Sequence, residues 1–548
     1  MERGAGTRFG ALALGIVLVC FAATGAHATL AKWFPMESRF FRTSDACQSC
    51  HNTLIDSAGR DISIGVEWRA SIMANAARDP YWQAAFVREL IDHPAQREHI
   101  EDVCSRCHMP MANEEYRAQG EHGKIFEHLP IGKDETEGDR FAADGVSCTV
   151  CHQIQPDKLG TRESWTGEFV IDRTTPDDRR AIFGPFVIDS GRTRVMHSAS
   201  RFIPTEGTHL KLSELCATCH QLYTQPFDRD DRPIDIQFPE QVPYLEWYHS
   251  AYRGNQTCQD CHMFIERDST PITSVLPQPR PEVNRHVFTG GNFFMLRMLN
   301  RYRGELGVTA MPQELNASAE RTENFLRTET ARIAVERAAI ANNRLDATVF
   351  VRNLAGHKFP TAYPSRRAWV HFTVRDRNGN IVFESGAIRP DGSIVGNNND
   401  DNPAQFEPHH DVISTPGQVI IYESIMVAPE GYVTTGLLTG VRYIKDNRLL
   451  PDGFDKGNVP SDIEVHGDAR EDANFIAGSD RVRYSVPVNA ADGPFRITAK
   501  LWYQPISFRW AHNLEAYDAA ETQRFLRYFK SMADVSGIVV AEDVVEAR

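Results

Sequence analysis

The sequence predicts a mainly α-helical and irregular domain, followed by a helical bridge and an antiparallel β-sandwich domain. Three observations predict this order. A C-x-x-C-H motif recurs five times in the first half, helical apolar spacing follows it, and short runs of alternating polar and apolar residues dominate the rest. We therefore divide the chain into residues 1–28, 29–290, 291–344, 345–505 and 506–548.

Residues 1–28 have the pattern of a removable export signal. Two arginines precede an apolar run, and Ala26 and Ala28 form a small-residue cleavage site, so we expect the mature chain to begin at Thr29. A retained membrane anchor is the alternative, but the apolar run is short for a span. Cys20 lies inside this signal. We therefore expect no retained transmembrane span.

The five C-x-x-C-H motifs predict covalently attached haem. Two cysteines at this spacing reach the two vinyl groups of one porphyrin, and the adjacent histidine binds the iron. Zinc sites are the alternative, but they would use the pairs two by two and do not require a histidine after every second cysteine. The expected thioether cysteines are Cys47, Cys50, Cys104, Cys107, Cys148, Cys151, Cys216, Cys219, Cys258 and Cys261, and the expected proximal ligands are His51, His108, His152, His220 and His262.

These motifs use every cysteine of the mature chain, so we expect no disulfide framework in spite of export. Residues 29–290 are too few to wrap each of five haems in its own hydrophobic core. The porphyrins must then supply much of the apolar interior and lie close to one another. We expect this segment to be a multihaem cytochrome domain.

The individual elements are expected in the following order. Helices are expected within 66–91, 212–220 and 246–252, then across the bridge at 292–308 and 312–341. Strands are expected at 345–353, 366–376, 381–386, 418–427, 481–488 and 495–503, with a hairpin turn at Asn378-Gly379. The tail is expected to return to helix at 518–533.

The charge of the chain restricts its partners. The formal net charge is -14, and haem propionates would make the protein more acidic still. Nucleic acid and anionic lipid are therefore excluded as expected partners, whereas basic redox proteins are compatible. Asn397 to Asp401, with Glu407 and Asp411, could supply oxygen ligands for calcium, although a polar turn explains the same residues.

Several segments around the motifs resemble a known family. They are "ACQSCH" with "EWRAS", "CSRCHMPM", "DGVSCTVCH", "LCATCH", and "EWYHSAY" before "CQDCHMF". They resemble the multihaem c-type cytochromes of the cytochrome c-552/c-554 type. The resemblance implies an electron carrier whose irons mostly have two histidine ligands, with one iron open in some members. The segment "NLAGHKFPTAYPSRRAW" resembles the start of a β domain appended to some multihaem cytochromes.

The distal ligands must come from other side chains. His249 is the first candidate, because it lies among aromatic residues shortly before the fifth motif. His286 lies between that motif and two glycines that permit close approach. The remaining histidine candidates are His197 or His209, before the fourth motif, and His93 and His128, each before a loop break. His357 is expected to be hydrogen-bonded in a turn, with ligation across from the β domain as the alternative.

Met73 occupies a position where the resemblance implies a distal histidine, two residues after the serine of "W-x-x-S". A thioether ligand would raise the reduction potential of its haem relative to histidine. Core packing with a ligand from elsewhere and an open iron remain as alternatives.

The leading functional prediction is an exported pentahaem cytochrome, periplasmic and possibly outer-membrane-associated or extracellular. It would carry single electrons between redox proteins, such as other cytochromes or a quinol-linked complex. One alternative is an oxidoreductase with one open haem acting on a small nitrogen or sulfur compound, but no acid–base pair stands out in the sequence. A second alternative is a surface interaction protein that uses its β domain.

Overall fold

Short helices carry the five motifs. The computed structural model describes Met1 and residues 40–548, so the expected signal and Thr29 lie outside the described residues. The motif helices are α2 (Asp45–Gln48), α5 (Arg97–His108), α8 (Cys148–Cys151), α10 (Ser213–His220) and α12 (Cys258–His262). Local caps fix where such helices begin. In α12, for example, Thr257 and Asp260 form a capping box that starts the helix at Cys258.

The connections between the motifs contain further helices and little strand. These helices are α3 (Ile64–Arg69), α4 (Pro80–Asp92), α6 (Pro110–Arg117), α7 (Glu137–Ala143), α9 (Ser190–Ser200) and α11 (Pro243–Tyr248). Two-stranded pairs join β1 (Ala181–Gly184) to β2 (Ile203–Glu206), β3 (Leu222–Thr224) to β4 (Phe238–Gln241), β5 (Ile265–Glu266) to β8 (Val283–Asn284), and β6 (Thr270–Pro271) to β7 (Pro279–Arg280). Asp79 caps α4 by accepting hydrogen bonds from the Tyr81 and Trp82 amides.

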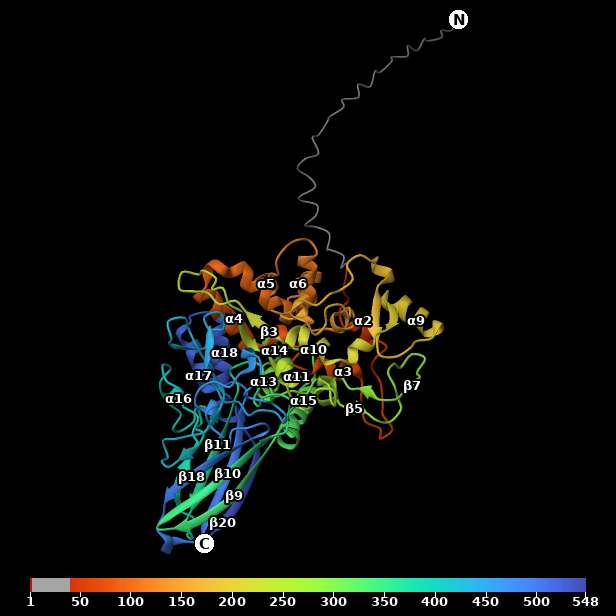
Figure 1. Ribbon diagram of the computed structural model, residues 1–548. Coiled ribbons are helices and arrows are strands. Elements are labelled where there is room, and N and C mark those ends of the chain that lie inside the picture. The colour runs from red at the N-terminus through yellow and green to blue at the C-terminus, as the bar shows by residue number, and fades with distance from the viewer. Residues whose placement is uncertain (2–39) are drawn as a thin grey trace. The chain divides into compact units, whose positions relative to one another are not determined.

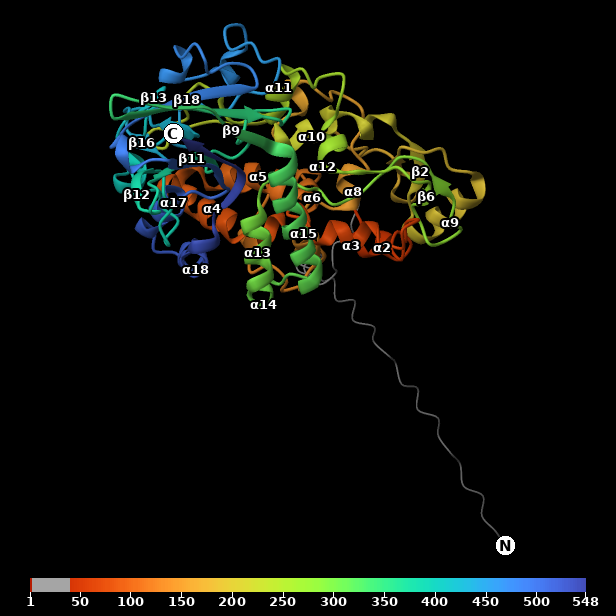
Figure 2. The same cartoon turned by 90° about the horizontal axis from the view of Figure 1, so that it is seen from below.

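Helices α13 (Phe293–Arg301), α14 (Arg303–Leu306) and α15 (Pro312–Phe325) follow the last motif. Figure 2 shows α13 and α15 side by side. The apolar side chains of α13 are buried, including Met295 and Met298. Tyr302 stacks on Tyr528 with ring centroids 3.7 Å apart, which joins this region to the C-terminal part of the chain.

The second half contains two larger antiparallel sheets. One has the strand order β13-β18-β10-β9 and the other β12-β11-β19-β20, with β14 also paired to β11. A third sheet has the order β16-β15-β17. Phe372 of β11 stacks on Tyr484 of β18 at 3.8 Å, so the two larger sheets pack face to face. The long strands lie together at one end in Figure 1, and helices α5 and α6 lie at the other.

The strand bounds are as follows. The four-stranded sheet contains β9 (Ala331–Ala341), β10 (Arg344–Asn353), β13 (Val412–Ile413) and β18 (Ser479–Pro487). The other large sheet contains β11 (Arg367–Arg375), β12 (Ile381–Ser385), β14 (Ile421–Tyr422), β19 (Phe495–Gln504) and β20 (Ile538–Ala547). The third contains β15 (Ser424–Val427), β16 (Val433–Thr434) and β17 (Arg442–Asp446).

Two expected helical segments are strands. Helix was predicted as far as residue 341, but residues 331–341 form β9, which turns back into β10 through Asn342 and Asn343 at positive φ. Two such residues form the kind of turn that joins antiparallel strands, and alternate burial of Ile333 and Val335 suits a sheet.

The C-terminal segment, residues 506–548, was predicted to be a helical tail, with its helix at 518–533. It contains two helices, α17 (Phe508–His512) and α18 (Ala520–Lys530). Helix α16 (Asn398–Asp401), from an earlier part of the chain, lies against α17. The chain then ends in β20, because its β-branched residues pair along β19.

One apolar core connects the helices after the last motif with the strands. Buried Phe293 and Leu299 belong to the same cluster as Val349, Phe372 and Tyr503. The described residues from 40 onward accordingly form one compact unit. No helix in this described part of the chain combines the length and apolar character that a membrane span requires.

Candidate haem-binding site

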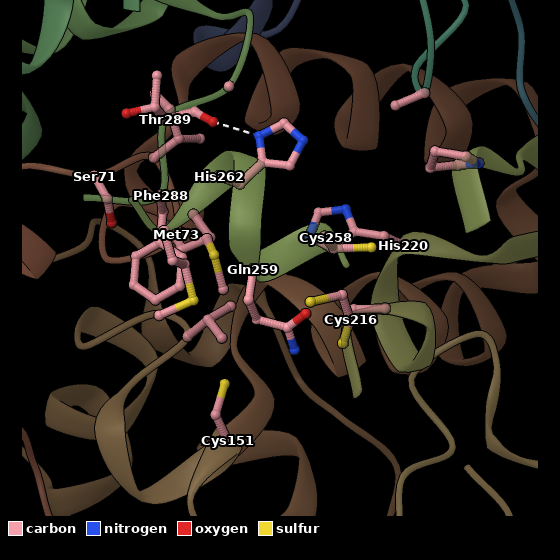
Figure 3. Close-up of a pocket in the computed structure, with 18 of the residues that line it drawn as sticks. Ser71, Met73, Cys151, Cys216, His220, Cys258, Gln259, His262, Phe288 and Thr289 are labelled. Atoms are coloured by element: carbon pink, nitrogen blue, oxygen red, sulfur yellow. Dashed lines mark hydrogen bonds between the residues drawn. The ribbon is translucent and has the colours of Figure 1, made fainter. Parts of the chain in front are cut away.

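Residues from all five motifs surround one cavity of about 1450 Å³. Figure 3 shows His220 and His262 there with Cys151, Cys216 and Cys258. Pockets for single drug-sized ligands are smaller, at about 300–1,000 Å³. The size and the shared lining indicate a space for several large groups rather than five separate pockets.

The motif histidines are oriented as metal ligands. Nδ1 donates a hydrogen bond to a backbone carbonyl in four of the five, which fixes the ring and leaves the Nε2 lone pair free. The acceptors are Ile272 for His51 (2.6 Å), Ala76 for His108 (2.9 Å), Phe183 for His152 (2.6 Å) and Thr289 for His262 (2.5 Å; Figure 3). Burial lowers the pKa of His108 and of His220 to about 4, so both imidazoles are neutral at pH 7.

The motif cysteines are unpaired and bring neighbouring motifs together. Cys47 of the first motif is within hydrogen-bonding reach of Cys148 of the third. The fourth motif is a junction, because Cys219 reaches Cys107 of the second motif, Cys216 reaches Cys258 of the fifth, and Cys151 of the third also lies nearby. The five motifs therefore form one continuous cluster.

Two motif histidines face a second, nearly parallel imidazole. His152 and His286 have ring centroids 6.3 Å apart and planes 15° from parallel, and His262 and His357 have centroids 6.3 Å apart and planes 8° from parallel. Two imidazoles on opposite sides of one metal ion have centroids roughly 6–6.5 Å apart, because each metal–nitrogen bond is about 2 Å long. Both pairs have this separation.

His286 and Met73 are the expected distal candidates that line the cavity. Burial lowers the pKa of His286 to about 3, and His152 and His51 contribute, so the ring is neutral. Figure 3 places Met73 next to Phe288. Met73 thus stays a candidate ligand or packing residue.

The other expected distal candidates do not line the cavity. Both ring nitrogens of His93 are hydrogen-bonded, to Asp231 and Thr439, and both of His128, to Asp139 and Tyr116. Neither histidine retains a free nitrogen for iron.

The remaining three candidates also lie outside the cavity. Nε2 of His197 donates to the Asp178 carbonyl (2.6 Å), and Nε2 of His209 donates to the Ile154 carbonyl (2.8 Å). His249 follows α11 and packs against Tyr248. The structure therefore leaves these three histidines outside the cavity, although His209 lies close enough to His152 to contribute to lowering its pKa.

The expected calcium ligands already have protein partners. Asp400 pairs with buried Arg367 at 2.8 Å, Glu407 accepts a hydrogen bond from His410 at 2.6 Å, and Asp411 pairs with Arg483 at 2.6 Å. These contacts occupy carboxylate oxygens that a calcium ion would need as ligands.

His409, Asp472 and Asp480 form a second acidic group, with ligand atoms within 4.8 Å of one another. The amide of Asn447 is fixed by two backbone groups and donates to His409 Nδ1 at 3.1 Å. His409 Nε2 must then carry the proton and donate to Asp472, so it has no lone pair for a metal.

Two kinds of cavity-lining residue were absent from the main candidates predicted from the sequence. His357 and His99 line the cavity although neither stood among the main distal candidates. Glu240 and Glu89 also line it, and burial together with the charge of Glu89 raises the pKa of Glu240 to about 8. These residues come from segments far apart in the chain, so local patterns could not reveal their contacts.

The donor set fits covalently bound haem. Each motif presents its histidine at the cavity wall, four motifs present both cysteines there and the first presents Cys47, and two of the histidines face a second imidazole of the right separation. Haem held by such residues supplies one-electron iron chemistry.

No protein-family model and no curated protein matches this chain. Among solved structures, it is similar to the pentahaem cytochrome c552 from Thermochromatium tepidum, with a TM-score of 0.52 and 14% sequence identity. The match covers 94% of this chain and 100% of that one, so it includes both the motif-bearing part and the sheets. The chain shares the fold of that multihaem cytochrome.

Proposed function

We propose that the protein is an exported c-type cytochrome with five haems that passes single electrons between redox partners. The observation that carries this proposal is the continuity of the five motifs around one cavity. Haems attached to touching motifs lie close enough to exchange electrons without leaving the protein. The described residues supply ligands and apolar surroundings, which are the means by which a protein sets haem potentials.

The partners follow from charge and compartment. The formal net charge of -14 favours basic docking surfaces on other redox proteins. Covalent haem and an export signal together favour the periplasm or the outer surface of a bacterial cell. Other cytochromes or a quinol-linked complex fit this description.

The junction role of the fourth motif can be tested by flash photoreduction. In a Cys216→Ala/Cys219→Ala variant, we expect the other haems to remain attached but electrons to redistribute among them much more slowly than in the wild type. The matched control is Cys47→Ala/Cys50→Ala. This variant removes the first motif, whose thiols contact only the third motif, through Cys148. Equal redistribution in the wild type and the junction variant would contradict a continuous chain.

His286 is expected to hold the iron bound by His152. His286→Ala should convert one low-spin haem per chain to high spin, because a six-coordinate iron becomes five-coordinate. The EPR spectrum of the oxidised protein measures this change, and His128→Ala serves as a control because His128 does not line the cavity and bonds through both ring nitrogens to Asp139 and Tyr116. An unchanged spectrum would remove His286 from the ligands.

An oxidoreductase is the second candidate function. Glu240 favours it, because a buried carboxyl with a pKa of about 8 is protonated at pH 7 and could donate a proton to a small substrate. Glu240 also lies near Cys104 of the second motif. High-spin iron that binds cyanide in the wild-type protein would favour this function over simple electron transfer.

A further inference from the structure

We propose that His357, supplied by the strand-rich half of the chain, is the distal ligand of the haem attached to Cys258 and Cys261. This inference rests on the proposed haem attachment. Its first support is the pairing of His357 with His262, whose rings are 8° from parallel with centroids 6.3 Å apart. The His152–His286 pair has the same separation, although its histidines come from different segments.

The hydrogen bonds of both rings leave the correct nitrogens free. His262 Nδ1 donates to the Thr289 carbonyl at 2.5 Å, and His357 Nδ1 donates to the Lys358 carbonyl at 2.9 Å. A carbonyl can only accept, so each Nδ1 carries the proton and each Nε2 keeps a lone pair. Metal-binding histidines use this arrangement to fix both tautomer and orientation.

The loop that carries His357 is anchored at both ends. Asn353 is fully buried, and its amide donates to the carbonyls of His357 (2.8 Å) and Leu449 (3.0 Å). Tyr252 donates to the Leu354 carbonyl at 2.6 Å, which ties the loop to the segment just before the fifth motif. These hydrogen bonds between protein groups hold the loop in place without any contribution from a bound ligand.

Close packing restricts the loop further. A Cβ atom on Gly356 would lie 3.2 Å from the Tyr252 ring and 3.4 Å from Trp247. Glycine thus allows the loop to approach the aromatic residues around α11. This contact brings the neighbouring His357 into the cavity, where it is a lining residue.

A network of buried charged side chains next to His357 also restrains the loop. The Lys358 amide donates to Glu246 Oε2 at 3.1 Å, and Lys358 Nζ donates to Asp446 Oδ2 at 2.7 Å. Arg448 completes the network through Glu246 (2.9 Å) and Asp446 (2.7 Å). Glu246 belongs to α11 and the other three to the strand-rich half, so the network positions His357 against the fifth motif.

The two halves of the chain therefore build one haem site together. Without His357, the iron bound by His262 would lose a ligand and become accessible to exogenous molecules. The sheets consequently have a direct part in tuning the potential of this haem rather than serving only as a separate docking module.

EPR of the fully haem-loaded protein tests the proposal. His357→Ala should add a high-spin signal that integrates to one haem per chain, and added imidazole should return that haem to low spin. His371→Ala is the matched control, because His371 lies on β11 and bonds to Glu384 at 2.8 Å. A His357→Ala protein that retains its haems and the wild-type spin state would overturn the proposal.

A second variant covers the possibility that alanine disturbs folding. His357→Met should keep the iron low-spin but raise the reduction potential of one haem, since methionine ligation raises it. Unchanged potentials in this variant would also overturn the assignment. Haem content measured in parallel separates the two proposals. A wild-type protein without attached haem would refute the proposed function. A fully haem-loaded His357→Ala variant with the wild-type spectrum would refute only the role of His357.

Discussion

A chain produced without haem is expected to lack the described fold. The cavity of about 1450 Å³ would then be empty or filled with water. The wall of this cavity is largely apolar, so without haem its side chains would lose their packing partners and face water. Because a folded domain is stabilised by only about 5–15 kcal/mol, the loss of several haem-sized groups from one interior should unfold the chain.

Near-UV circular dichroism of protein made without cytochrome maturation measures this effect. We expect loss of fixed tertiary signal, with the matured protein from the same sequence as the control. A Cys258→Ala/Cys261→Ala variant should show a smaller loss, because it removes one haem and leaves the other four. A haem-free chain that unfolds cooperatively with the stability of the matured protein would contradict the expectation.

Asp446→Ala is expected to destabilise the protein by about 3–5 kcal/mol, as is usual when one partner of a buried charge pair is removed. Asp446 is 2% exposed and binds both Lys358, which is fully buried, and Arg448. Without Asp446, the Lys358 ammonium would lose its direct carboxylate partner. Urea unfolding of the haem-loaded protein measures the change.

The control for Asp446→Ala is Glu430→Ala, which removes an exposed ion pair with Arg229 and should cost about 0–1 kcal/mol. Equal losses in the two variants would contradict a special role for the buried network.

The same network predicts a dependence on pH. Burial alone would raise the pKa of Asp446, but the charges of Arg448 and Lys358 outweigh it and hold the pKa well below its usual range. A carboxylate with a depressed pKa stabilises the fold fully above its unfolded pKa of about 3.9, and that stability is lost as pH falls toward the folded value. The difference in stability between the wild type and Asp446→Asn should therefore shrink below about pH 4.

The sequence was most informative where chemistry is local. A C-x-x-C-H motif contains both candidate attachment cysteines and a candidate ligand, so five candidate sites could be located by inspection, and residues of all five motifs lie at one cavity. Alternation also identified most of the long strands. It failed at residues 331–341, because a run such as "ARIAVERAAIA" satisfies helical and strand spacing equally, and only pairing with β10 decides between them.

The distal ligands depend on contacts that no local pattern contains. His249 had the most favourable neighbours in the sequence, yet His357 lies opposite a motif histidine because a loop between strands packs on α11. His93 and His128 were predicted as distal ligands because each precedes a loop break. In the structure, both ring nitrogens of each histidine form hydrogen bonds within the protein. Tertiary structure therefore decides which histidines remain free.

The most direct test of the account is the number of haems bound to the mature chain. Intact mass of protein produced with cytochrome maturation should exceed the mass of the processed chain by five haems, one for each motif. The absorbance of the pyridine haemochrome should give the same ratio of haem to protein. Fully matured protein that carries four or fewer haems would contradict the proposal that all five motifs build one electron-transfer chain.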